Sequence, residues 1–148
     1  MGFEIKRVGV IGAGQMGNGI AHVCALAGYD VSLNDMSIER IHLGLATING
    51  NMTRQVNKGV VSEADKNTAL ARISPAENLD ALSDCDLVVE AATENEQVKR
   101  KIFQQLCPVL KPETLLATNT SSISITRLAA STDRPEKFVG VHFMNPVP

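Results

Sequence analysis

Short aliphatic runs alternate with longer amphipathic segments along most of the chain. Each run is about six residues long and leads into Gly, Asp, Asn or other polar residues, which is typical of strands buried on both faces of a parallel sheet. The runs predict strands at residues 6–11, 29–34, 86–91, 114–119 and 138–143.

The segments between these runs carry apolar residues at spacings of three and four, which places them on one face of a helix. Met16 and Ile20 begin the first such face, and Gly28 follows where a helix C-terminus favours glycine. Ser37 and Ser62 stand at N-cap positions of later segments. The pattern predicts helices at about residues 15–27, 38–57, 62–72, 96–109 and 125–130.

Strands that alternate with helices predict an α/β fold of Rossmann-like, doubly wound type, in which right-handed crossovers build a mostly parallel sheet. The helices at 38–57 and 62–72 are longer than one crossover requires, so we expect them to project from the sheet as a helical hairpin. Residues 1–148 are expected to form one domain.

The composition narrows the classes of partner. The chain has a net charge of −2, no Trp, one Tyr and four Phe, which disfavours a nucleic-acid surface and attraction to anionic membranes. No run of about 18 apolar residues is present, so we expect a cytoplasmic protein. Cys24, Cys85 and Cys107 are expected to be free thiols rather than a disulfide or metal set. Because no H-E-x-x-H motif or Cys/His cluster occurs, no metal site is predicted.

A glycine motif stands between the first predicted strand and helix, in the stretch VGVIGAGQMGNGIA. In this context G-x-G-x-x-G is typical of dinucleotide binding. Gly12 permits the tight turn, Gly14 allows a pyrophosphate to approach the backbone, and Gly17 allows close packing of helix on strand. The predicted pyrophosphate site comprises Gly12, Ala13, Gly14, Gln15, Met16 and Gly17.

Asp35 ends the second predicted strand, 18 residues after Gly17. A carboxylate here accepts hydrogen bonds from the adenosine ribose hydroxyls. It also opposes a 2′-phosphate, because two unit charges ~4 Å apart at an effective dielectric of 20 interact by about 4 kcal/mol. Met36 and Ser37 place no arginine next to it, so the sequence favours NAD over NADP as cofactor.

Polar residues also follow the later strands, in the segments EAATE, NTSS and HFMN. Ligands of open α/β sheets bind at the carboxyl ends of the strands. An imidazole at His142 can accept a proton near neutral pH, and Asn145 with the NTSS turn can hold a substrate hydroxyl beside it. Hydride transfer from a secondary alcohol requires such a base. His22 and His42 lie within predicted helices and are interpreted as structural.

The whole chain resembles the NAD-binding domain of the 3-hydroxyacyl-CoA dehydrogenases, and most of all the bacterial 3-hydroxybutyryl-CoA dehydrogenases. The resemblance rests on VGVIGAGQMGNGIA, GLATINGNMTRQVNKG, VVEAATEN, ATNTSSISIT and GVHFMNPVP, in that order. It implies an NAD-dependent oxidoreductase that acts on the C3 hydroxyl or ketone of a short-chain acyl-CoA, in fatty-acid or butanoate metabolism.

The resemblance also implies roles for single residues. The glycine turn and Asp35 would hold NAD. Glu94 and Lys99 would contact the nicotinamide ribose side of the cofactor, and Asn51 and Lys58 would contact coenzyme A. The catalytic set would be His142 as general acid or base, Ser121 between the substrate hydroxyl and the nicotinamide, and Asn145 close to the nicotinamide.

The family has a glutamate that pairs with the catalytic histidine and a helical C-terminal domain that closes over the substrate and forms a homodimer. We expect both to be absent from this chain and the chain alone to be nearly inactive, because an unpaired histidine loses the group that orients it. Two other interpretations stay open. One is the NAD-binding domain of another hydroxyacid dehydrogenase, with a lysine base on a later helix. The other is an NAD-binding module without enzymatic activity.

Overall fold

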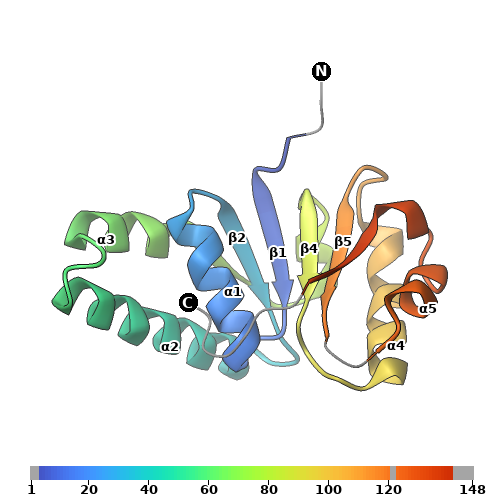
Figure 1. The fold of residues 1–148 in the computed structure, drawn as a ribbon, viewed down its shortest axis with the longest axis horizontal. Helices are drawn as coiled ribbons and strands as arrows, with labels where there is room; N and C mark the ends of the chain where they lie inside the picture. The colour runs from blue at the N-terminus through green and yellow to red at the C-terminus, as the bar shows by residue number, and fades with distance from the viewer. Residues whose placement is uncertain (1–3, 121–122, 142–148) are drawn as a thin grey trace.

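A six-stranded parallel sheet forms the centre of the structure, a computed structural model that describes residues 4–120 and 123–141 (Figure 1). The strand order is β3-β2-β1-β4-β5-β6, and every neighbouring pair is parallel. The predicted doubly wound α/β fold is therefore confirmed. The strands are β1 (Arg7–Ile11), β2 (Asp30–Asn34), β3 (Ile73–Ala76), β4 (Leu87–Glu90), β5 (Leu115–Asn119) and β6 (Phe138–Val141).

Helices cover both faces of the sheet. In Figure 1, α1 with α2 and α3 lies on one side, and α4 with α5 lies on the other. The helix predicted to reach residue 109 ends earlier, because Pro108 has no N–H to donate and the chain tightens into a 3₁₀ turn. The helices are α1 (Gln15–Leu26), α2 (Ile38–Asn57), α3 (Glu63–Ala71), α4 (Glu96–Leu106) and α5 (Ile125–Ala130), with 3₁₀ turns η1 (Leu79–Leu82), η2 (Cys107–Val109) and η3 (Pro135–Lys137).

The edge strand β3 was not predicted from the sequence pattern. It is short, and only Ile73 and Ala76 are buried, whereas Ser74 and Pro75 are exposed. Pro75 cannot donate to a second neighbour, which a sheet tolerates at its edge. The strand is therefore defined by its pairing with β2 and not by an apolar run of its own.

The predicted helical hairpin is confirmed. One face of α2 is buried against the domain through Ile41, Ile48 and Met52, while the far part of α2 projects with α3 beyond the sheet (Figure 1). His22 of α1 is fully buried and bonds through Nε2 to Gln55 Oε1 at 2.8 Å, so it connects α1 to α2 and has the structural position that its sequence context indicated.

The order of the strands determines where a ligand can bind. β1 pairs with β2 on one side and with β4 on the other, so Ile11 stands beside Asn34 and Glu90 at the carboxyl ends. The chain runs from β1 outward through β2 to β3 on one side, and then crosses to β4, β5 and β6 on the other side. Such a switch point opens a crevice outside the carboxyl ends of the strands.

Two further features concern the described residues only. No helix among them is long and apolar enough to cross a membrane. Cys24, Cys85 and Cys107 are free thiols, and burial raises the pKa of Cys85 to about 11, so this thiol stays protonated at neutral pH.

Candidate functional site

The glycine turn between β1 and α1 has the geometry that its motif predicts. Gly12 has a φ of +107°, and a Cβ on it would lie 2.7 Å from the Ala91 carbonyl oxygen. A Cβ on Gly17 would lie 1.6 Å from the Gly12 carbonyl oxygen. Gly12 and Gly17 therefore let the turn, strand β4 and helix α1 pack together.

Gly14 differs from these two glycines, because a Cβ there would meet nothing within 4 Å. It is the N-cap residue of α1 and supplies no side-chain bond to the first N–H groups of the helix. Open space in front of uncapped helix N–H groups fits a phosphate. The turn as built thus suits the pyrophosphate of a dinucleotide.

Asp35 is joined to this turn by its side chain. Its Oδ2 accepts a hydrogen bond from the Ala13 N–H at 2.7 Å, and its Oδ1 accepts one from the Met36 N–H at 2.6 Å. Each carboxylate oxygen has a second lone pair that remains available to a ribose hydroxyl. The structure therefore brings the predicted ribose-binding acid beside the predicted pyrophosphate turn.

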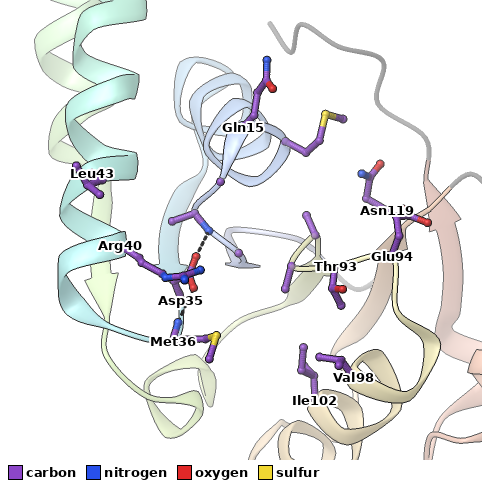
Figure 2. Close-up of a pocket in the computed structure, with 16 residues that line it drawn as sticks. Gln15, Asp35, Met36, Arg40, Leu43, Thr93, Glu94, Val98, Ile102 and Asn119 are labelled. Carbon is purple, nitrogen blue, oxygen red and sulfur yellow. Dashed lines mark hydrogen bonds between the residues drawn. The ribbon is translucent and has the colours of Figure 1, made fainter.

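A cavity of about 1010 Å³ lies along this turn and is shown in Figure 2. Residues of the glycine turn, Asp35 and Glu94 line it, as the sequence predicts. Asn119, from the NTSS turn, lines it too, and the cavity wall also contains residues that the sequence did not single out, among them Met36, Arg40, Leu43, Val98 and Ile102. The apolar side chains among them give the cavity a surface on which the base of a nucleotide can pack.

The cavity wall contains an arginine that the sequence did not place near Asp35. Met36 and Ser37 indeed bring no guanidinium to Asp35, but Arg40 does reach the cavity. Ser37 caps α2 and accepts a hydrogen bond from the Arg40 N–H at 3.3 Å, so the first helical turn brings Arg40 back to the side of Asp35. The prediction from sequence rested only on Met36 and Ser37, the residues next to Asp35 in the chain, and therefore did not place Arg40 on the same side.

Glu94 and Asn119 approach the cavity from two neighbouring strands, β4 and β5 (Figure 2). The Thr120 hydroxyl donates to Glu94 Oε2 at 2.8 Å and accepts from the Ile123 N–H at 3.2 Å. Glu94, which the resemblance assigns to the nicotinamide side, thus lines the cavity and is bonded to the loop that follows β5.

Lys99, which the resemblance places at the nicotinamide ribose side, is held by three acceptors within the domain. Its side chain is fully buried, and Nζ donates to Glu90 Oε1 at 2.5 Å, to Thr118 Oγ1 at 3.1 Å and to the Asn119 carbonyl at 3.3 Å. An ammonium has three protons, so these three acceptors use them all. Lys99 is not among the residues that line the cavity, and it holds the backbone of Asn119, which does line it.

Asn51 and Lys58 lie on the projecting part of α2, and neither lines the cavity. Asn51 Oδ1 accepts a hydrogen bond from Arg54, and Lys58 is exposed at the C-cap of the helix. Asn51 is about 20 Å along the helix from the residues next to Asp35. The structure therefore separates these two residues from the glycine turn.

Ser121, His142 and Asn145, the predicted catalytic set, lie outside the described residues. The strands that precede them are adjacent, since Asn119 of β5 is paired with Val141 of β6. Within residues 4–120 and 123–141, no group of three His, Cys, Asp or Glu side chains could hold a metal ion.

The sequence of residues 7–148 matches the family described as 3-hydroxyacyl-CoA dehydrogenase, NAD binding domain. The chain belongs to this family. The resemblance that the motifs indicated is thereby confirmed, and NAD is the cofactor of this domain. Such a cofactor needs a turn that accommodates a pyrophosphate and an acid that accepts from a ribose, and the geometry of the glycine turn and Asp35 is compatible with both.

Named relatives agree with this membership. A 3-hydroxybutyryl-CoA dehydrogenase of Bradyrhizobium diazoefficiens is 69% identical over 148 residues, which are 100% of this chain and 50% of that protein. A 3-hydroxyadipyl-CoA dehydrogenase of Escherichia coli is 43% identical over 100% of this chain and 31% of its own length. The crystal structure of (S)-3-hydroxybutyryl-CoA dehydrogenase from Ralstonia eutropha has a TM-score of 0.95 and 47% identity over 98% of this chain and 51% of that one. The chain thus spans about half of these dehydrogenases, or less.

Proposed function

We propose that this chain is the NAD-binding half of a 3-hydroxyacyl-CoA dehydrogenase that interconverts short-chain 3-hydroxyacyl-CoA and 3-ketoacyl-CoA, such as 3-hydroxybutyryl-CoA and acetoacetyl-CoA. The observation that carries the proposal is the placement of the Asp35 carboxylate on the Gly12–Gly17 turn, in a chain of this family. Bound NAD would supply the acceptor for the hydride that leaves C3 of the substrate. The relatives support this substrate class, since two of those compared are 3-hydroxybutyryl-CoA dehydrogenases.

Residues of the chain would bind the two ends of the cofactor differently. The N–H groups at the start of α1 face the pyrophosphate over Gly14, and Asp35 accepts hydrogen bonds from the adenosine ribose hydroxyls. Glu94 contacts the nicotinamide ribose side. Lys99 acts there through the Asn119 carbonyl that it holds.

His142 would take the proton of the C3 hydroxyl when the alcohol is oxidised and return it when the ketone is reduced. Ser121 would orient that hydroxyl towards the nicotinamide, and Asn145 would lie close to the nicotinamide. Asn51 and Lys58 would bind coenzyme A on the projecting helix, where the positive charge of Lys58 suits a phosphate-rich ligand. A base placed in this way accelerates proton transfer by roughly 10²–10⁴-fold.

The complete enzyme would be longer than this chain. We propose that a helical second domain closes over the acyl-CoA and forms a homodimer in the cytoplasm, since the dehydrogenases compared are about twice as long or longer. That part would also supply the glutamate that orients His142. The chain by itself should then bind NAD and turn over little, because its histidine lacks that partner.

Two measurements test the proposal. NAD binding by this chain is measured calorimetrically, and NADH oxidation by acetoacetyl-CoA is followed with the chain and with the enzyme that includes the second domain. We expect NAD binding in both and turnover in the longer protein alone. Turnover by the chain at a rate near that of the longer protein would defeat the idea that its site is incomplete.

The role of His142 is tested in the longer protein by His142→Gln. Lost turnover with unchanged NAD affinity supports the base, whereas retained turnover removes it and favours a dehydrogenase with a base elsewhere. His42→Gln is the matched control, because His42 is an exposed histidine of α2 that does not line the cavity. Failure of the longer protein to reduce any 3-ketoacyl-CoA, with NAD still bound, would favour a non-enzymatic module.

A further inference from the structure

Arg40 stands apart from the other arginines of the chain. All seven arginines lie within the described residues, and the guanidinium groups of six of them donate to a carboxylate, a side-chain oxygen or a carbonyl there. The Arg40 side chain has no such acceptor among the described residues. A guanidinium has five N–H donors, so this side chain can bind an additional anion.

The stability of helix α2 does not explain an arginine at this position. Arg40 is the third residue after the Ser37 cap, and a cation in the first turn opposes the helix dipole. Glu39, its neighbour, has the sign that this end of a helix favours. A residue that is unfavourable for its own helix and has no partner is a candidate for binding a ligand.

The cavity gives that ligand a place. Arg40 and Asp35 line the same cavity, and Figure 2 shows the guanidinium on the side of the cavity where the Asp35 carboxylate lies. No carboxylate of the described residues is within 4.0 Å of the Arg40 guanidinium, so its charge is not cancelled by an ion pair. Both oxygens of Asp35 are already held by backbone N–H groups, which fixes the ribose-binding carboxylate in place beside this cation.

We propose that Arg40 binds a phosphate on the adenosine ribose, so that the site accepts NADP as a weaker second cofactor. The inference rests on the proposed function, because it requires the adenosine ribose to lie at Asp35. Asp35 alone repels a 2′-phosphate, and the nearby guanidinium offsets part of that repulsion with charge-assisted hydrogen bonds that suit phosphate geometry. NAD lacks the phosphate and gains nothing from these bonds.

The experiment is a calorimetric comparison of NAD and NADP binding to the chain and to three variants. Arg40→Met keeps the length of the side chain without its charge, and Arg40→Lys keeps the charge without the fork. Arg54→Met is the control, since Arg54 is an exposed arginine of the same helix, about 21 Å from Arg40. Thermal unfolding of each variant verifies that it folds.

We expect wild-type chain to bind NADP, and Arg40→Met to weaken NADP binding about fivefold or more while NAD affinity changes less than about twofold. Arg40→Lys should lie between these two, and Arg54→Met should match wild type. NADP affinity should also fall more steeply with salt than NAD affinity in wild type, and this difference should shrink in Arg40→Met.

Several outcomes would overturn the inference. Equal losses for NAD and NADP in Arg40→Met would mean that the guanidinium stacks on the adenine ring, which both cofactors share. Absence of NADP binding to wild type, at concentrations where NAD saturates, would show that repulsion of the 2′-phosphate by Asp35 outweighs its attraction to Arg40. Binding of 3′,5′-ADP that depends on Arg40 more than binding of 2′,5′-ADP would assign the residue to coenzyme A. Absence of NAD binding would defeat the proposed function first.

Discussion

The buried ion pair of Glu90 and Lys99 allows a quantitative prediction for a variant that removes one charge. Both side chains are fully buried, and Nζ lies 2.5 Å from Glu90 Oε1. In Glu90→Gln the shape of the side chain is retained, but the ammonium loses its counter-charge and stays in a fully buried site. Breaking a buried pair in this way costs about 3–5 kcal/mol, which is a large part of the 5–15 kcal/mol by which most domains are stable.

Urea unfolding followed by circular dichroism measures this loss. With a slope of about 2 kcal/mol per M, a loss of 3 to 5 kcal/mol lowers the midpoint by roughly 1.5 to 2.5 M. The pair also holds two backbone groups of the cavity wall, since Glu90 Oε2 accepts from the Ala92 N–H at 2.9 Å and Lys99 donates to the Asn119 carbonyl. NAD affinity of the folded variant should therefore fall as well.

A double variant tests whether the loss comes from a charge that is left buried alone. Lys99→Met combined with Glu90→Leu removes both charges, and we expect the double variant to be more stable than Glu90→Gln because no charge remains buried alone. Arg127→Met serves as the control, because it breaks the Arg127–Glu96 pair on the surface, where water screens both charges. If Glu90→Gln unfolds at the midpoint of wild type, the ammonium is solvated and the argument from burial is wrong.

Two further predictions concern the glycine turn and the buried histidine. Gly17→Ala should prevent folding or greatly lower the melting temperature, because its Cβ would overlap the Gly12 carbonyl. Gly14→Ala should keep the melting temperature and weaken NAD binding about tenfold or more. Equal melting temperatures for the two variants would contradict the packing argument. Burial lowers the pKa of His22, partly offset by its hydrogen bond to Gln55, and its Nδ1 is buried with no partner among the described residues. The unfolded chain therefore takes up a proton below about pH 6.5 that the folded chain resists, so urea midpoints should fall from pH 7 to pH 5 in wild type and fall less in His22→Gln. Equal slopes in the two proteins would show that His22 is not the group responsible.

The residues that the sequence located correctly belong to local patterns. The turn from Gly12 to Gly17 follows a strand and opens a helix within a few residues, so its backbone geometry depends on neighbours in the chain. Asp35 was identified by its distance of 18 residues from Gly17, because one helix and one strand of ordinary length separate the glycine turn from the end of the second strand. The projecting hairpin was found because two long amphipathic segments occur where one short helix would suffice.

Features that depend on distant segments could not be read in this way. The strand Ile73–Ala76 exists because β2 offers it a partner, and its own pattern is broken by Pro75. The wall residues Val98 and Ile102 stand one helical turn apart, a spacing that also occurs on ordinary helix faces, so no local signal marks them as lining a cavity.

The charged residues show where the boundary between sequence and tertiary structure lies. Periodicity and glycine placement determined the fold class, the turn at Gly12–Gly17 and the position of Asp35 at the end of β2, because these depend on backbone conformation over short stretches of chain. Only the tertiary structure decided that Lys99 is buried with Glu90, while Arg40 reaches a cavity without an ion-pair partner among the described residues. Both are basic side chains on amphipathic helices, and what each one does depends on which acceptors other segments bring within a few ångströms of it. Burial and pairing are properties of the assembled sheet and helices, and the order of residues alone does not contain them.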